Sequence, residues 1–186
     1  MTGKTHNSTI IVHADGSTLT NPGRGAWASI TVKKEGSKKV YERILTRVYK
    51  QTTNNRMELL GIIETLEYII KHNESKNSEI KAVSDSKYVI RSASEWIEGW
   101  KRNNWRSSSG KSVKNKDLMI RIDRIKRTIP NIVFIWTRGH ADNIQNNRCD
   151  LIARNEAKNL KRKAIIDKLY EEPYQDIQTQ EGILEI

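Results

Sequence analysis

The clearest pattern in the chain is a run of apolar residues at helical spacing in its first half. The repeat consists of Leu59, Ile62, Ile63, Leu66, Ile69 and Ile70. Such spacing predicts one buried face on a helix that ends at about His72. The polar stretch Gln51–Arg56 precedes the repeat, so Glu58 falls in the first turn, at the edge of that face. A carboxylate in this place can cap the helix or face the end of a neighbouring strand.

Strands are predicted on both sides of this helix. They are Thr9–Asp15, Ala26–Lys34, Lys38–Tyr49, Ile80–Ser84 and Ile132–Trp136. The short link Glu35–Ser37 indicates an antiparallel hairpin between the second strand and the third. The last strand is apolar without alternation, which is typical of a strand buried on both faces.

Further helices are predicted in the second half of the chain. They are Ser86–Ser94, Glu95–Asn103, Lys114–Thr128 and a last helix that begins near Arg148. Three strands followed by helices mixed with strands indicate an α/β fold, in which helices pack on a mixed sheet. At 186 residues the chain suits one domain, which we place at 8–166. A polar extension at 1–7 and a loosely held acidic tail at 167–186 are expected to flank it.

Composition narrows the class of protein. Hydrophobic residues at 36% and charged residues at 30% suit a soluble globular domain. Apolar runs fall short of a membrane span, and Met1–Ser8 is too polar for a signal peptide. Cys149 is the only cysteine, which excludes an intramolecular disulfide and the Cys-rich zinc sites. We therefore expect a cytoplasmic protein that does not engage a membrane.

The charge distribution points to a polyanionic partner. The net charge is +11 at pH 7, and the positive charge is concentrated in one part of the chain. Between Lys87 and Arg127 the net charge is +8, whereas residues 167–186 carry −5. This asymmetry favours a nucleic-acid site in the body of the domain.

Four acids lie where secondary-structure elements begin or end. Asp15 and Asp85 end predicted strands, and Glu58 and Asp150 fall in the first turns of predicted helices. Each also has a local explanation, as a turn residue, as a helix cap or as an acid that complements a helix dipole. For Glu58 this alternative is a capping box with Asn55. In α/β sheets, however, ligands bind beyond the carboxyl ends of strands, where four such acids would converge.

Convergence would give the four acids a common chemistry. Carboxylates crowded in one crevice repel one another, and Mg²⁺ relieves that repulsion because it prefers hard oxygen ligands. Two ions roughly 3.5–4 Å apart could flank a phosphate, one with the attacking water and one with the leaving oxygen. His140, ten residues before Asp150, could move protons there, or it could be an ordinary surface histidine.

Four segments give the chain a family resemblance. They are Asp15-Gly16-Ser17 with Asn21-Pro22-Gly23, Thr52–Leu59, Ser84-Asp85-Ser86 with Tyr88-Val89, and His140-Ala141 with Asn146 and Arg148-Cys149-Asp150. In this order, from about Ser8 to Ala157, they resemble type 1 ribonuclease H of the bacterial kind. The Thr52–Leu59 segment is highly specific, whereas Asp-Gly-Ser alone is weak. The resemblance implies a five-stranded mixed sheet flanked by helices, with three antiparallel strands followed by parallel ones.

The resemblance also implies an activity and the residues that perform it. The activity is endonucleolytic cutting of the RNA strand of an RNA–DNA hybrid by a monomer, with two Mg²⁺ ions for which Mn²⁺ can substitute. Metal binding is implied for Asp15, Glu58, Asp85 and Asp150, and His140 matches a catalytic loop histidine. Hybrid contacts are implied for Gly16, Ser17, Asn21, Asn54 and Asn55, and a DNA-phosphate pocket for Thr53 and Asn115.

A basic protrusion around 95–115 completes the resemblance, and we call it the handle. It interleaves tryptophans and cations, among them Trp96, Trp100, Lys101, Arg102 and Trp105. Trp96 and Trp100 share a helix face and partly anchor the handle, while Trp105 and the cations are expected to face the hybrid.

Two departures from the family pattern, and two other functions, need to be considered. Lys87 stands where the family commonly has glutamine, which puts one substrate contact in doubt. Arg24, in a glycine-rich turn, could contact a phosphate or lie in solvent. The first alternative function is a non-catalytic hybrid-binding module of the same fold, against which the four acids and His140 argue. The second is a nuclease of this fold that acts on DNA junctions or as a 3′ exonuclease, which the Thr52–Leu59 segment and the handle do not support.

Overall fold

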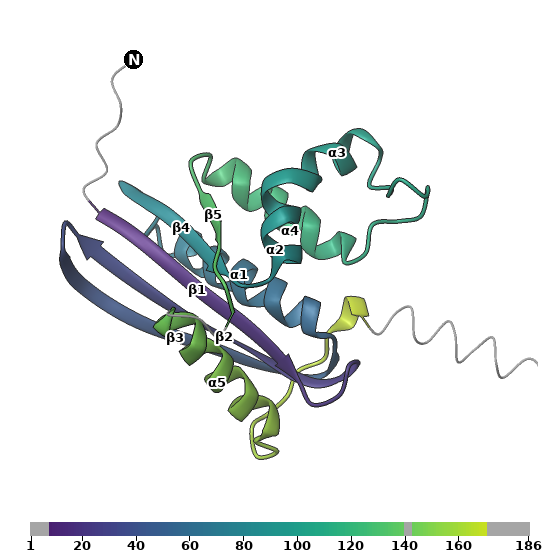
Figure 1. Cartoon of the computed structure of the whole chain (residues 1–186), viewed down its shortest axis with the longest axis horizontal. Helices are drawn as coiled ribbons and strands as arrows, with labels where there is room; N and C mark the ends of the chain where they lie inside the picture. Colours follow the sequence, from purple (N-terminus) through teal and green to yellow (C-terminus); the bar gives the residue numbers. More distant parts are fainter. Residues whose placement is uncertain (1–7, 140–142, 171–186) are drawn as a thin grey trace, which may run out of the picture.

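A five-stranded mixed sheet forms the centre of the computed structural model, which describes residues 8–139 and 143–170. Its strands are β1 (Ser8–Thr18), β2 (Gly23–Glu35), β3 (Lys38–Thr52), β4 (Ser78–Ser84) and β5 (Val133–Trp136). They lie in the order β3-β2-β1-β4-β5, with antiparallel pairing from β3 to β1 and parallel pairing from β1 to β5 (Figure 1). The predicted fold class is confirmed.

The helices continue the same chain order. They are α1 (Asn54–Lys71), α2 (Lys87–Arg91), α3 (Ile97–Arg102), α4 (Lys116–Thr128) and α5 (Ile144–Lys158). A π-helical turn at Ser92–Trp96 joins α2 to α3, so the two predicted short helices form one continuous helical path. In the described part of the chain, every helix is too short or too polar to cross a membrane.

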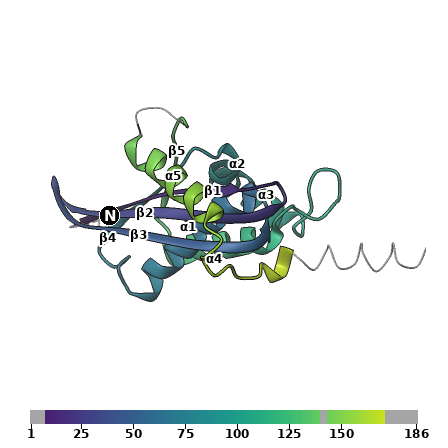
Figure 2. The ribbon, with the colours of Figure 1, turned by 90° about the horizontal axis from the view of Figure 1, so that it is seen from below.

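Helices cover both faces of the sheet. Helix α5 packs on one face, and α1, backed by α4, packs on the other (Figure 2). The side chains of β2 alternate accordingly, since Trp27 belongs to the core under α1 while Ile30 and Val32 pack with Cys149 of α5. Burial on both faces fixes the register of the central strands, because a slip of one residue would exchange the two cores.

The strand β5 departs from the sequence-based prediction. It was expected to be buried on both faces, but Val133 is 42% exposed and Trp136 is 45% exposed. The physical reason is its place at the edge of the sheet, where it pairs with β4 alone. Only the two middle residues of the strand, Phe134 and Ile135, are half-buried.

The chain beyond α5 remains packed on the domain as far as Tyr170, the last described residue. The backbone of Ile165 exchanges hydrogen bonds with Val48 and Lys50 of β3, at 2.9 Å each. Asp167 is 7% exposed, so the predicted boundary at 166/167 does not coincide with a loss of packing. Residues 171–186, the rest of the expected tail, lie outside the described residues.

Arg24 has a structural role that differs from both expected ones. Its guanidinium donates hydrogen bonds to the backbone oxygens of Ala157, Asn159 and Arg162, at 2.9–3.0 Å. These carbonyls lie at and just beyond the end of α5, where a cation is favoured. Arg24 therefore links the C-terminal end of α5 to the start of β2.

Candidate active site and nucleic-acid interface

Asp15 lies near the end of the central strand and close to the start of α1. The two elements approach so closely that a Cβ on Gly16 would come within 2.5 Å of the Glu58 amide nitrogen and of the Met57 Cβ. A side chain at position 16 would separate them, so glycine is required there by packing. The contact brings Asp15, which is 7% exposed, toward Glu58.

Glu58 is the fifth residue of α1 and lies beyond the first turn. The helix begins with Thr53 as its N-cap, whose side-chain oxygen accepts a hydrogen bond from the Arg56 amide at 3.4 Å. The predicted capping box between Asn55 and Glu58 is therefore wrong, because Thr53 starts the helix two residues earlier. Glu58 instead interacts with the side chain of Ser86, just after β4.

Asp85 follows β4 directly, as the sequence predicts, and the loop after β5 packs over it. A Cβ on Gly139 would lie 2.7 Å from the Asp85 Oδ2 atom. The indole nitrogen of Trp136 donates a hydrogen bond to the Asp85 backbone oxygen at 2.9 Å. The end of β5 thus holds the backbone of Asp85, and the loop after β5 lies against its carboxylate.

Asp150 is carried by α5, on the opposite face of the sheet from α1. The helix begins at Ile144, four residues before the predicted start, because the Asn143 side chain caps it by accepting a hydrogen bond from the Asn146 amide. Asp150 is therefore in the second turn rather than the first. Its carboxylate forms an ion pair with Arg154, one turn further along α5.

Electrostatics connect the four acids. The pKa of Asp15 is raised to about 8, first by burial and then by the negative charges of Asp85, Glu58 and Asp150, against a hydrogen bond from the Gly16 amide that lowers it. Burial also raises the pKa of Glu58, opposed by Ser86 and reinforced by Asp85. The other three carboxylates therefore lie close enough to Asp15 to disfavour its charge, which places Asp15 at the centre of the group.

The donor set fits a hard divalent cation. All four groups are carboxylates, which are oxygen ligands of the kind that Mg²⁺ prefers, and a cation would relieve the cost of ionising Asp15. Within residues 8–139 and 143–170, however, no three His, Cys, Asp or Glu side chains form a ready metal-binding cluster. Asp150 in particular is occupied by Arg154. His140 lies outside the described residues.

Polar side chains expected to contact the hybrid gather beside Asp15. The Thr18 hydroxyl donates to the Asn54 Oδ1 atom at 2.6 Å, and the Asn21 Oδ1 atom accepts from the Asn54 amide at 3.3 Å. Gly16 and Ser17 precede this group on β1, and Asn55 is exposed on α1. The turn after β1 and the start of α1 therefore form one continuous polar surface.

Thr53 and Asn115, expected to bind a DNA phosphate, are the N-cap residues of α1 and α4. Arg56 links them, because its backbone amide bonds Thr53 and its Nη1 atom donates to the Asn115 Oδ1 atom at 3.4 Å. The Asn115 Nδ2 atom in turn donates to the Tyr88 hydroxyl at 3.2 Å. The two residues thus belong to one hydrogen-bonded group, although 62 positions separate them.

The handle projects from the end of the domain formed by α3 and the loop before α4 (Figure 1). Trp96 lies between Tyr88 of α2 and Trp100, with tilted rings whose centroids are 6.3 and 5.6 Å apart. Trp105, half-buried, takes a left-handed backbone conformation with φ of 59°. Trp100 and Trp105 both pack against the main hydrophobic core, which attaches the handle to the domain.

The cations near the handle differ in their surroundings. Lys101 forms ion pairs with the buried Asp123 at 2.8 Å and with Glu98 at 3.3 Å, whereas Arg102 is exposed. Lys87, the departure from the family pattern, places its Nζ atom 5.2 Å from the Trp136 ring centroid. Lys87 is thereby held above the edge strand that supports Asp85.

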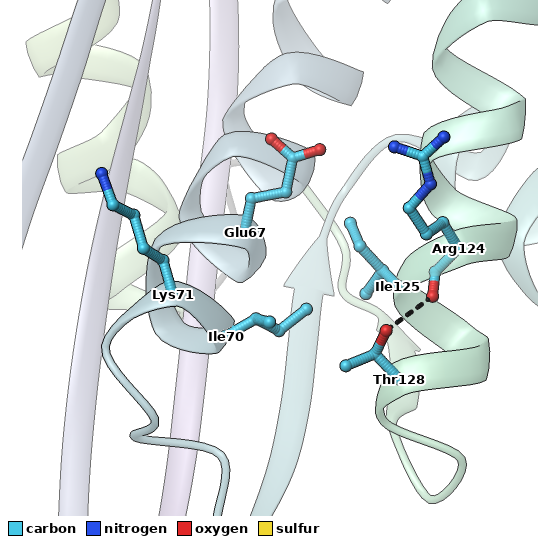
Figure 3. A pocket seen from close by; sticks show the side chains of 6 residues that line it. All are labelled: Glu67, Ile70, Lys71, Arg124, Ile125 and Thr128. Atoms are coloured by element: carbon cyan, nitrogen blue, oxygen red, sulfur yellow. Dashed lines mark hydrogen bonds between the residues drawn. The ribbon is translucent and has the colours of Figure 1, made fainter.

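A separate hollow of about 280 Å³ lies between α1 and α4, on the face away from α5 (Figure 3). Its lining residues are Glu67, Ile70, Lys71, Arg124, Ile125 and Thr128. The one carboxylate of the hollow, that of Glu67, accepts hydrogen bonds from the Arg121 guanidinium at 2.6 and 2.9 Å. The Thr128 hydroxyl donates to the Arg124 backbone oxygen. The candidate chemistry lies elsewhere, at the four acids.

Several residues of the site were not identified from the sequence. Gly139 and Ser86 contact the acids directly, and Arg154 neutralises one of them. The glycine beside His140 and the hydroxyl beside Asp85 were visible in the sequence, but only the fold shows what they touch. Arg56 lies inside the most specific segment, yet its partners come from distant parts of the chain.

Comparison with known proteins agrees with this geometry. Residues 7–158 match the RNase H family. A ribonuclease H of Cereibacter sphaeroides (strain ATCC 17025 / ATH 2.4.3) is 39% identical over 79% of the chain and 93% of its own length. The ribonuclease HI of Haemophilus influenzae is 40% identical over 81% of the chain and 90% of its own length.

Solved structures give the same result for the fold. LC9-RNase H1, a type 1 RNase H with the type 2 active-site motif, superposes with a TM-score of 0.68 at 26% identity, over 81% of the chain and 72% of its own. LC11-RNase H1 in complex with an RNA/DNA hybrid superposes with a TM-score of 0.57 at 21% identity, over 79% and 95%. With its central carboxylate group on a mixed sheet, the chain belongs to the RNase H family. The predicted family and its endoribonuclease activity on RNA–DNA hybrids are confirmed.

Proposed function

We propose that Asp15, Glu58, Asp85 and Asp150 hold two Mg²⁺ ions and that the RNA strand is hydrolysed there, leaving 5′-phosphate and 3′-hydroxyl ends. The observation that carries this proposal is the buried carboxylate of Asp15, whose pKa is raised by burial and by the three other acids. A buried carboxylate surrounded by three other acids is costly to ionise without cations, and a site that binds nucleic acid without cutting it has no need of such a group.

The chain's own residues would hold and orient the ions, which when bound supply an activated water and stabilise the leaving oxygen. Asp15 lies at the centre, Glu58 is held by Ser86, and Asp85 is held by the end of β5. Asp150 would exchange Arg154 for metal, because one carboxylate cannot serve both fully. We assign His140 to proton transfer at the leaving group.

Selection of the hybrid would be divided between two neighbouring groups. Asn21, Asn54 and Asn55, with Gly16 and Ser17, would contact the RNA strand, where amides can bond 2′-hydroxyls in the wide minor groove. Thr53 and Asn115 would bind a DNA phosphate, since both begin helices and helix N-termini favour anions. Further residues in or near the handle would contact the hybrid or support those that do: Lys87, Trp96, Trp100, Lys101, Arg102 and Trp105.

We further propose that the protein acts as a cytoplasmic monomer that removes primers and R-loops. Mn²⁺ is expected to replace Mg²⁺ because it accepts the same oxygen ligands. The family and the charge of +11, which favours association with a polyanion, support the proposed role on hybrids.

The test is incubation with a labelled RNA–DNA hybrid, duplex RNA and duplex DNA, each with Mg²⁺ or with EDTA. Cleavage of the RNA strand of the hybrid alone, and only with the metal, is the expected result. Cutting of duplex DNA, or cutting of the hybrid in EDTA, would overturn the proposal. Tight hybrid binding without turnover in any divalent metal would identify a non-catalytic module instead.

A further inference from the structure

Arg56 is buried, with 3% of its surface exposed, and every donor of its guanidinium is used. An arginine has five N–H donors. Those of Arg56 make two hydrogen bonds with Asp117, at 2.8 and 3.1 Å, two with Asp167, at 2.6 and 2.8 Å, and one with Asn115. Such a paired, planar arrangement fixes the guanidinium in one orientation.

The two acids reach Arg56 from different parts of the chain. Asp117 lies in the first turn of α4, just after Asn115. Asp167 belongs to the segment after α5, which the backbone bonds of Ile165 attach to β3. Thr52 adds a bond from its hydroxyl to the Asp167 Oδ2 atom at 3.3 Å. The segment beyond α5 is therefore joined to the start of α1 at the expected phosphate pocket.

Arg56 in turn determines which groups of the pocket face outward. Its amide donates to the Thr53 hydroxyl oxygen, which leaves the hydroxyl hydrogen free to donate. Its Nη1 atom bonds the Asn115 oxygen, so the Asn115 amide group points its N–H donors away from Arg56, one of them to Tyr88. Both orientations present donors, which is what a phosphate oxygen requires.

Arg56 itself is poorly suited to bind the phosphate. Burial lowers its pKa, but the bonds with Asp117 and Asp167 outweigh burial and raise it above its usual value, so the guanidinium remains charged. Two carboxylates face this single positive charge, and the local charge is negative. Removal of one carboxylate would, by charge alone, make the pocket more attractive to an anion.

We propose that Asp167 is a positioning residue for hybrid binding: through Arg56 it holds Asn115 and Thr53 in the orientation that accepts a phosphate of the DNA strand. The inference rests on the phosphate-pocket role assigned to Thr53 and Asn115 above. It extends the functional unit to the segment beyond α5, past residue 158, where the family match ends.

The test compares steady-state kinetics of Asp167→Ala with the intact protein on an RNA–DNA hybrid in Mg²⁺. Loss of positioning should raise KM roughly three- to tenfold and leave kcat within about twofold. A change of charge alone predicts the opposite, a lower KM. Glu74→Ala is the matched control, because Glu74 also pairs with an arginine, Arg43 at 2.8 Å, but at the far end of α1; its KM should stay unchanged.

A double-mutant cycle with Asn115→Ala separates this inference from the proposed function. If Asp167 acts through Asn115, Asp167→Ala should have little further effect on KM once Asn115 is alanine. An Asn115→Ala variant with normal KM would refute the phosphate pocket itself. A raised KM in Asn115→Ala beside a normal or lowered KM in Asp167→Ala would refute only the positioning role, and additive effects would do the same.

Two controls test for a loss of stability. They are thermal melts and a second variant, Asp167→Asn, which keeps the shape of the side chain. All assays are run well below the Tm of the least stable variant. NMR of the Asn115 side-chain amide gives a readout independent of activity. Its resonances should shift or broaden in both Asp167 variants while those of Asn21 stay in place, and unmoved Asn115 resonances would overturn the proposal.

Discussion

The carboxylate of Asp85 and the backbone of Gly139 lie in direct contact, so that a Cβ on the glycine would come within 2.7 Å of the Asp85 Oδ2 atom. The contact joins the end of β4 to the loop that follows β5. It explains why the segment before His140 carries a glycine, because a side chain at that position would displace Asp85, one of the four acids proposed to bind metal.

Gly139→Ala should displace the Asp85 carboxylate and lower kcat by at least about tenfold, because small misplacements of reacting groups have large effects. The Tm should change little, since Gly139 lies in a loop beside an edge strand. Steady-state kinetics and a thermal melt check both parts. An unchanged kcat would show that the loop yields instead of the carboxylate.

Glu58→Gln should lower kcat by orders of magnitude and leave the Tm within about 2 °C. The reason is that Thr53, not Glu58, caps α1, so the change removes a charge at the metal site without weakening the helix. Thr53→Ala is the contrasting variant and should lose about 1 kcal/mol of unfolding free energy. A Glu58→Gln variant with a much lower Tm that keeps high activity below that Tm would show that Glu58 mainly stabilises the helix.

The raised pKa of Asp15 predicts how the stability of the metal-free protein depends on pH. Its pKa is about 8 in the folded protein against about 3.9 in an unfolded chain, so folding favours the protonated acid. The contribution of Asp15 to stability should be greatest below pH 4, fall as the pH rises from about 4 to about 8, and stay low above that. Thermal melts in EDTA should show this loss, and Mg²⁺ should reverse part of it at pH 8.

The matched variant for this pH dependence is Asp15→Asn, which cannot ionise. In EDTA at pH 8 its Tm should exceed that of the intact protein by several degrees. It should also bind the hybrid at least as tightly, without turnover, because one repulsive charge is gone. Equal Tm values across the pH range would show that Asp15 is not held in the unfavourable surroundings described above.

Truncation to alanine of two neighbours in the handle, Arg102 and Lys101, should affect different properties of the enzyme. Arg102→Ala should raise KM two- to fivefold, about 0.4–1 kcal/mol, and reduce the slope of log KM against log salt by about one. Lys101→Ala should mainly lower the Tm, because it leaves the buried Asp123 with one partner fewer. Lys38→Ala, at the β2–β3 hairpin far from the handle (Figure 1), is the control for lost surface charge.

Much of the fold could be predicted from hydrophobic periodicity, because burial on both faces of a sheet leaves a strong pattern. The place of β5 at the edge of the sheet could not be predicted, because an edge strand and a central strand can both be runs of apolar residues. The helix starts were uncertain for a local reason. Thr53, Asn54 and Asn55 are all good N-cap residues, and the choice among them depends on tertiary contacts.

The candidate site was predictable as a set of residue types, not as a set of contacts. Asp15, Glu58, Asp85 and Asp150 could be chosen because each adjoins the end or start of an element. Their supports could not, because Gly139, Ser86 and Arg154 acquire meaning only from the residues they meet. Asp167 is the clearest case, since its ion pair with Arg56 spans 111 positions.

The position of α5 has a consequence for synthesis of the protein. A chain leaving the ribosome completes β1, α1, β4 and the handle before α5, which carries Asp150 and packs across β1 and β2. A nascent chain can therefore display its cationic handle while the carboxylate group is still missing a member. The proposed four-acid site is complete only when the last helix has docked, so it is assembled at the end of synthesis.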